Sequence, residues 1–335
     1  MLKRLFPITL LMLVATLGFS QNPQPIKIAS PSNSPNQPES VLACVPGFGN
    51  EAGTISLGAF VGSSNDVDFD TMYLCFNDQI LIDHDAGTES FAGDPDMTSP
   101  AGIGYAFYDC PPTVNGDLIT IQSDPCVTDT PLPVGGAMAL PYIATSPDNS
   151  GDVLFENLGF LQTLFGGGSP VLKWFAPITY DQLNGATAVF EGNPAGPCVD
   201  VNTDVAFAVV YLNEITATNI QSTFGGSNCQ GSFDIAGGLP EFDAAESYNI
   251  SITLNSDPSI TGTVISGTAT NGENVKFKIT TPGLYDVVVT DGKACPANFQ
   301  IDMTGCTALE MIIPDLTATP GSQICLPVTV SNFNN

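Results

Sequence analysis

The chain of 335 residues carries a formal net charge of −27 at pH 7, because 34 side chains are acidic and only 7 are basic. A field of this sign repels the phosphates of nucleic acids and the headgroups of anionic membranes, which argues against both as partners. Charged residues are nevertheless only 12% of the chain and hydrophobic residues 43%, which excludes an acidic disordered tail and predicts buried cores.

Residues 1–20 have the pattern of a secretory signal peptide. Lys3 and Arg4 give a positive start, residues 5–19 are almost wholly apolar, and Ser20 is a small residue at the expected cleavage point. The apolar run is short for a membrane span, and no later segment reaches spanning length. We therefore expect an extracellular or cell-surface protein that is not inserted in a membrane once the signal is removed.

The next segments differ sharply in composition. Residues 21–40 contain five prolines among Ser, Asn and Gln, which predicts a flexible leader. Residues 41–219 contain short apolar alternations broken by Gly, Pro, Asn and Asp, clearest over Val205–Tyr211, and predict one all-β N-terminal domain. Trp174 lies in a segment that is apolar on both faces, so burial is favoured over stacking on a sugar ring.

Residues 228–306 have the sharpest strand pattern. Apolar and polar residues alternate over Tyr248–Leu254 and again over Val275–Ile279, and a Gly-containing turn separates two further alternating runs between residues 284 and 303. Short, evenly spaced strands with turn signals predict an immunoglobulin-like sandwich. The expected fold class is thus all-β, with antiparallel β-sandwich domains in tandem.

The framework of this second domain also carries a resemblance. Its fixed positions are Cys229, Gly231, Phe233, Ile235, Gly237, Gly238, Pro240, Pro282, Gly283, Tyr285, Val287, Val289, Asp291 and Cys295. In this spacing residues 228–306 resemble the SprB-type repeat of gliding-motility surface adhesins. The stretch FAGDPDMTSPAGIGYAFYDCPP in the first domain resembles N-terminal segments of large proteins that leave the cell through a type IX secretion system.

Residues 315–335 look like the start of another module. Pro320 and Gly321 predict a turn, and apolar residues then occupy alternate positions over Ile324–Val330, as in a half-buried strand. This segment resembles the opening of a cohesin-like domain, a sandwich found in scaffolding and carbohydrate-associated surface proteins. The resemblance implies that the chain is the N-terminal fragment of a longer modular protein, cut inside a third, cohesin-like β domain.

No catalytic motif accompanies the single histidine. His84 lies in LIDHDAG between Asp83 and Asp85, whereas a hydrolase triad needs a nucleophile on an elbow and an orienting carboxylate, and the GxSxG motif is lacking. We interpret His84 as a loop histidine in an acidic turn. Carboxylates are abundant enough to suggest a glycosidase pair anywhere, but no site motif supports one, so the sequence predicts no catalytic residues and no enzyme.

Calcium is the one cofactor that the sequence suggests. Asp83 and Asp85 form one Asp-x-Asp pair, and Asp94 and Asp96 form another across AGTESFAG. Carboxylate oxygens are the hard ligands that calcium prefers, and acidic exported sandwiches often use the ion to fix loops. The spacing does not follow the EF-hand register, so ordinary solvated turns remain the alternative.

Nine cysteines in an exported chain predict disulfides, and the odd number leaves at least one without a partner in this sequence. Cys110 and Cys126 close a short loop rich in turn-forming residues, and we expect them to be bridged.

A second bridge follows from the expected immunoglobulin-like fold. With its first strand placed after Cys229, that cysteine lies at the same pole as Cys295, in the turn between the last two strands, which predicts a Cys229–Cys295 bond. Cys306 then lies at the opposite pole, free to pair with Cys325 or with a cysteine in a continuation of the chain.

These observations favour a secreted or cell-surface structural and adhesive modular protein that binds and scaffolds without catalysis. Its expected partner is a surface glycan or another cell-surface protein. The alternative is a carbohydrate-binding or carbohydrate-active surface protein with accessory β-sandwich modules. A continuation with more immunoglobulin-like repeats and a sorting domain would favour the first interpretation, and one with a catalytic domain the second.

Overall fold

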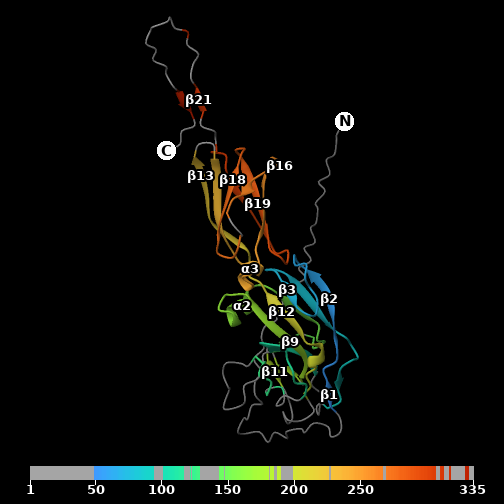
Figure 1. Ribbon diagram of the computed structural model, residues 1–335. Helices are drawn as coiled ribbons and strands as arrows, with labels where there is room; N and C mark the ends of the chain where they lie inside the picture. The colour runs from blue at the N-terminus through green and yellow to red at the C-terminus, as the bar shows by residue number, and fades with distance from the viewer. Residues whose placement is uncertain are drawn as a thin grey trace, which may run out of the picture.

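A computed structural model shows two β-sandwiches that follow one another along an elongated molecule (Figure 1). No helix within the described part of the chain is long and apolar enough to cross a membrane. The predicted signal peptide, leader and most of the third module lie outside the described residues. The structure describes residues 49–93, 101–116, 121, 123–128, 143–146, 148–180, 182–184, 187–189, 199–225, 228–266, 269–306, 310–312, 317 and 329–331.

The N-terminal sandwich packs a three-stranded sheet against a five-stranded one. The smaller sheet has the order β2 (Ile55–Val61), β4 (Gln79–His84), β8 (Val153–Glu156). The larger has the order β3 (Met72–Leu74), β12 (Phe207–Tyr211), β9 (Val171–Tyr180), β6 (Gly102–Tyr108), β7 (Ile143–Thr145). β3 runs parallel to β12, and the other pairings in both sheets are antiparallel.

Aromatic side chains fill the space between these two sheets. Phe175 of β9 is fully buried and meets the rings of Phe107 and Phe155 edge to face, with centroids 4.8 Å apart in each pair. Phe207 and Tyr211 of β12 face the same core, as the alternation over residues 205–211 predicts. The interlocked rings give this short-stranded domain a well-defined core between its two sheets.

The other face of the larger sheet is covered as well. Ile178 and Tyr180 of β9 are buried there, and Trp174 is partly buried against the same cluster, in line with the packing role expected from its sequence. The bond between Cys110 and Cys126 holds part of the covering loop, and this pairing agrees with the sequence analysis. β6 is consequently buried along its whole length.

Short elements complete the first domain. β1 (Asn50–Glu51) pairs with β5 (Ser90–Phe91), and β10 (Gln182–Asn184) pairs with β11 (Thr187–Val189). The α-helix α2 (Phe160–Phe165) precedes β9, and a 3-10 turn, η2 (Thr203–Val205), precedes β12.

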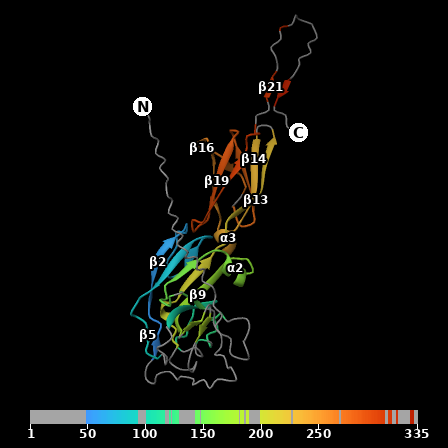
Figure 2. The same cartoon turned by 180° about the vertical axis from the view of Figure 1, so that it is seen from behind.

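The second sandwich has the immunoglobulin-like strand order. One sheet runs β13 (Thr216–Gly225), β14 (Asn228–Ala236), β18 (Asn274–Ile279), β17 (Thr263–Val264), and corresponds to strands A-B-E-D. The other runs β16 (Asp257–Thr261), β15 (Asn249–Leu254), β19 (Leu284–Thr290), β20 (Pro296–Asp302), and corresponds to C′-C-F-G. The short helix α3 (Gly238–Phe242) lies where the two domains meet (Figures 1 and 2). Beyond the sandwich, β21 (Glu310–Ile312) pairs with β22 (Thr329–Ser331).

The second sandwich starts earlier than its sequence predicts. β13 begins at Thr216 and pairs with β14, so the first strand lies ahead of residue 228 and partly inside the segment assigned to the first domain. β13 is an edge strand whose described side chains are mostly polar and exposed, and a bulge between Thr218 and Gln221 breaks its alternation. A strand of this kind leaves almost no periodic apolar signal.

The extra strand overturns the predicted bond between Cys229 and Cys295. Cys229 opens the second strand, not the first, and therefore lies at the opposite pole, opposite Ile279 at the end of β18. There it bonds to Cys306, which follows the last strand, with 5.7 Å between the two Cα atoms. Cys306 is thus not available to Cys325, and Cys295 bonds instead to Cys75 of the first domain.

The two intradomain bonds close loops of different length, with sequence separations of 77 for Cys229–Cys306 and 16 for Cys110–Cys126. Loop-closure entropy predicts that replacing both cysteines by serine lowers the free energy of unfolding by about 4.5 and about 3 kcal/mol, respectively. Urea unfolding of the two double variants measures whether the loss is larger for Cys229→Ser/Cys306→Ser than for Cys110→Ser/Cys126→Ser. Peptide mapping under non-reducing conditions checks the pairing, and recovery of Cys229 joined to Cys295 would contradict the strand order given above.

Candidate functional site

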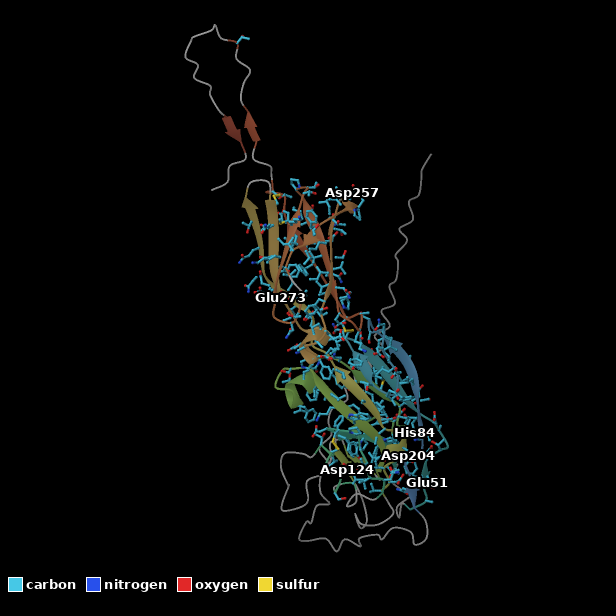
Figure 3. All side chains as sticks on the ribbon, viewed as in Figure 1. Glu51, His84, Asp124, Asp204, Asp257 and Glu273 are labelled. Atoms are coloured by element: carbon cyan, nitrogen blue, oxygen red, sulfur yellow. A yellow bond between two sulfur atoms is a disulfide. The ribbon has the colours of Figure 1, made fainter. Side chains whose placement is uncertain are left out.

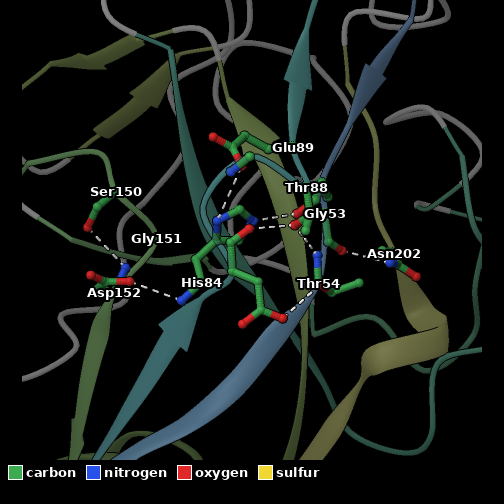
Figure 4. Close-up of polar contacts among 12 residues, drawn as sticks. Gly53, Thr54, His84, Thr88, Glu89, Ser150, Gly151, Asp152 and Asn202 are labelled. Carbon is green, nitrogen blue, oxygen red and sulfur yellow. Dashed lines mark hydrogen bonds and ion pairs between the residues drawn. The ribbon is translucent and has the colours of Figure 1, made fainter.

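His84 lies inside the first sandwich, which corrects its assignment to a loop. It is the last residue of β4, its side chain is buried, and its Nε2 atom lies 3.0 Å from the carbonyl oxygen of Ala52 (Figure 4). Its Nδ1 atom lies 3.8 Å from a carboxylate oxygen of Glu89. The backbone N–H of His84 donates to Asp152 at 3.0 Å. The acidic neighbours suggested a turn, but strand geometry turns the histidine inward and its neighbours outward.

The backbone of two glycines packs closely against His84. A Cβ atom added at Gly53 would lie 2.7 Å from His84 Nε2, and one added at Gly151 would lie 2.9 Å from its Cβ. The nearby hydroxyl of Thr88 already donates to the Asp85 carbonyl at 2.7 Å and accepts from the N–H of Thr54 at 2.8 Å. The contacts of His84 therefore fix β4 against its neighbours and are those of a structural residue.

Asp83 and Asp85 point away from His84, on the outer side of β4, and their environments differ. Partial burial, followed by the charges of Asp152 and Asp85, raises the pKa of the Asp83 carboxyl. Hydrogen bonds from the hydroxyls of Thr54 and Ser56 lower the pKa of the Asp85 carboxyl. Only Asp85 is thus stabilised in its ionised form by its contacts.

The predicted calcium ligands are only half described. Asp94 and Asp96 lie outside the described residues, so calcium binding at this loop stays a prediction. Among the residues that are described, no group of three or more His, Cys, Asp or Glu side chains is placed to hold a metal ion.

Lys173 is another buried titratable residue of the first domain. It lies on β9, its side chain is almost fully buried, and its ammonium pairs with the carboxylate of Asp109. The ammonium also donates to the hydroxyl of Thr128 at 3.2 Å and lies 4.0 Å from the centroid of the Phe165 ring. Its contacts join β9, the end of β6 and helix α2, which is again a packing role.

The contact between the two domains is the most elaborate constellation in the molecule. Cys75, directly after β3, bonds to Cys295 in the turn between β19 and β20, and the two residues are 220 positions apart. Next to the bond, the ammonium of Lys293 pairs with the carboxylate of Asp66 and lies 4.0 Å from the ring centroid of Tyr73. We call this group, Asp66, Tyr73, Cys75, Lys293 and Cys295, the interdomain joint.

Electrostatics favour the charged form of Lys293 in this joint. Partial burial alone would lower the pKa of the Lys293 ammonium, but the hydrogen bond and charge of Asp66 outweigh it and the pKa is raised. The backbone adds a further link across the domains, because the N–H of Asn65 donates to the carbonyl of Lys293 at 3.0 Å. One turn of the second domain is therefore held by covalent, ionic and hydrogen bonds at once.

A buried aspartate shapes the first-domain side of the joint. Asp78 accepts from the backbone N–H of Cys75 at 3.0 Å, of Ser63 at 2.7 Å and of Ser64 at 3.0 Å, and its side chain is only 2% exposed. These three donors leave Asp78 well satisfied, and they hold the turn that presents Cys75.

Asp291 does the same on the second-domain side. It accepts from the N–H of Cys295 at 3.0 Å, of Lys293 at 2.9 Å and of Leu239 at 2.7 Å, and it is 3% exposed. The carboxylate thereby ties the β19–β20 turn to helix α3. Both halves of the joint are thus held in shape by a buried acceptor.

Apolar packing continues across the joint. Leu212 and Ile215, in the segment between the sandwiches, belong to the same buried cluster as Leu239 and Val289 of the second domain. Tyr73 of β3 meets Phe242 of α3 edge to face, with ring centroids 6.5 Å apart. The second core therefore extends into the end of the first domain and is not a separate unit behind a linker.

Sequence reasoning missed this joint. Its residues come from turns that are more than 200 positions apart, as the separation of 220 between the bonded cysteines shows. Two signals were present: the predicted first domain holds five cysteines, so at least one of them lacks a partner inside it, and Lys293 is one of only 7 basic residues in the chain.

Comparisons with known proteins add little to this picture. No family model matches the chain, and no curated protein matches it. Among solved structures, the FN1–FN3 domains of chicken CNTN1 match at 11% identity with a TM-score of 0.21, over 72% of this chain and 65% of that chain. The fold assignment consequently rests on the strand order given above.

Asp83 of β4 and Asp85, the residue after β4, should respond oppositely to neutralisation of their charge. At pH 7 Asp83→Asn should raise the urea midpoint, because ionised Asp83 is disfavoured in the folded state, and Asp85→Asn should lower it. A raised folded pKa means that Asp83 costs stability above its unfolded pKa of about 3.9, so the gain should vanish as the pH falls below that value.

The Asp83→Asn variant also tests the predicted calcium site. If calcium binds there, the wild-type melting temperature rises with added calcium and Asp83→Asn abolishes that rise. An equal response of the wild type and the variant to calcium and to chelator would remove Asp83 from the ligand set.

Asp291→Ala should lower the free energy of unfolding by about 2–3 kcal/mol, because it leaves buried backbone donors without an acceptor. Asp286→Ala is the matched control, since Asp286 also accepts two hydrogen bonds but from side chains on the surface. We expect the control to cost about 0.5 kcal/mol or less. Equal losses in urea unfolding would contradict a special role for Asp291.

Proposed function

We propose that this protein is a secreted or cell-surface module that adheres and scaffolds by binding, without catalysis. The observation that carries the proposal is the interdomain joint. Tandem domains ordinarily move relative to one another unless their interface is large and hydrophobic. Here a disulfide, an ion pair and a shared apolar cluster connect the domains, which supports a stiff element that presents surfaces at a fixed spacing.

The disulfides also support an extracellular compartment for the protein. Disulfides persist in oxidising surroundings and are rare in the cytosol, and three are formed among the described residues. Together with the predicted signal peptide, this supports an extracellular or cell-surface location. The resemblance of residues 228–306 to a gliding-motility adhesin repeat supports adhesion, and the resemblance of residues 315–335 to a cohesin-like opening supports a continuation into further modules.

Binding is favoured over catalysis because buried polar side chains of the first domain are engaged in structural contacts. His84 is held between a backbone carbonyl and Glu89, and Lys173 is held by Asp109 and Thr128. The carbohydrate-active alternative gains no comparable support, because Trp174, its best sugar-stacking candidate, packs against a buried cluster.

The proposal predicts that both domains unfold together. Trp174 is the only tryptophan and reports on the first domain, whereas circular dichroism reports on both. In the wild type the two signals should give one transition. In Cys75→Ser/Cys295→Ser they should separate, since the bond closes a span of 220 residues worth about 5 kcal/mol.

Cys110→Ser/Cys126→Ser provides the matched control, because it removes a bond of the first domain and leaves the joint intact. It should lower stability while the two signals stay coincident. Small-angle X-ray scattering should show a smaller spread of maximum dimensions for the wild type than for Cys75→Ser/Cys295→Ser. Two separate transitions in the wild type, or identical scattering of the wild type and Cys75→Ser/Cys295→Ser, would contradict the proposal of a stiff scaffold.

A further inference from the structure

Two of the three positive charges of the second domain lie on one open sheet face. Lys276 and Lys278 of β18 are both exposed and alternate with the buried Val275, Phe277 and Ile279, so they point to the same side. Two residues along a strand are separated by about 7 Å. The other two lysines in the described part of the chain, Lys173 and Lys293, are ion-paired, whereas no ion pair involves Lys276 or Lys278 there.

The residues beside these lysines are mostly polar, and one of them is charged: Asp234 of β14, opposite Asn274, faces the same side and accepts hydrogen bonds from Asn219 and Asn274. On β14, Ser232 lies opposite Lys276 and Gln230 lies opposite Lys278, and on β17 Thr263 lies opposite Lys278. Ser232 lies in turn beside Gln221 of β13. β18 is paired on both sides, so it has no free backbone edge next to the lysines. A ligand on this face can therefore be bound by side chains only. We call these residues of β13, β14, β18 and β17 the basic face.

We propose that the basic face binds an acidic polysaccharide, with Lys276 and Lys278 pairing with carboxylate or sulfate groups and the amides and hydroxyls beside them binding sugar hydroxyls. This inference rests on the proposed adhesive function and names the chemistry of its ligand. Two neighbouring ammonium groups without an ion pair, in a chain of net charge −27, are complementary to an external anion. Surface charges farther apart than about 8 Å are largely screened at physiological salt, so the carboxylate of Asp234 on the same face opposes this attraction, whereas more distant carboxylates do not cancel it.

Other partners fit the basic face less well. A protein interface is built around a desolvated apolar or aromatic anchor and is depleted in lysine, whereas the exposed apolar side chain beside Lys276, that of Ile265, stands next to two lysines. Single-stranded nucleic acid is recognised through aromatic platforms and longer basic tracks, which the named residues of this face lack. A hydrophilic, negatively charged chain lying on a flat polar sheet matches what is present.

The test compares two double variants with the same net charge. Lys276→Gln/Lys278→Gln removes the two cations, and Asn249→Asp/Asn298→Asp adds two anions at exposed positions of the opposite sheet. Binding of oligogalacturonate, dextran sulfate, neutral dextran and a DNA oligonucleotide is measured by titration calorimetry at physiological salt. Circular dichroism confirms that both variants remain folded.

We expect the wild type to bind at least one acidic glycan and not neutral dextran or DNA. The lysine variant should bind it at least about tenfold more weakly, in keeping with the loss of two charge-assisted contacts, and the aspartate variant within about twofold of wild type. The two acidic probes separate carboxylate from sulfate recognition.

Equal losses in both variants would reduce the effect to overall charge and overturn the proposal, as would equal binding of DNA or of neutral dextran. Failure to bind any acidic glycan would overturn it too, and sedimentation velocity would then show whether the lysines serve a contact between two copies. Each of these outcomes leaves the unfolding test of the interdomain joint unaffected, because neither variant alters Cys75 or Cys295.

Discussion

The bond between Cys75 and Cys295 is the constraint on which the rest of the molecule depends. It connects turns from two different domains, and it can form only when both turns have their native shape. The buried carboxylates of Asp78 and Asp291 provide that shape by accepting backbone N–H groups on each side. An acidic composition that looks like a plain solvated surface therefore includes aspartates that hold the joint together.

The alternation of apolar residues was enough to predict the fold class. Tyr248–Leu254 and Val275–Ile279 form strands whose apolar residues face the core, because a period of two is the direct signature of a half-buried strand. The same signal was present around His84, which follows Ile80 and Ile82 in phase on β4. Its acidic neighbours favour a turn instead, but the loop assignment was wrong and the phase of the strand is the correct signal.

The disulfide pattern and the joint could not be derived in the same way. Predicting a disulfide requires knowing at which pole of the sandwich each cysteine lies. One missed strand reverses the predicted pole of every residue after it. β13 was missed because an edge strand with polar side chains has little apolar periodicity. The pairing of Lys293 with Asp66 depends on how two whole domains pack, which no local pattern in either segment reports.

The stiff joint also bears on what the exposed charges can do. On a flexible linker, the lysines of β18 could fold back and pair with the acidic outer side of β4 in the same chain. The view in Figure 3 places His84, at the end of β4, in the half of the first sandwich away from the second domain. With the two domains held by a disulfide, an ion pair and a shared apolar cluster, that self-neutralisation is prevented. The basic face thus stays open to a partner outside the chain, so the rigidity behind the proposed scaffold also preserves the proposed binding surface.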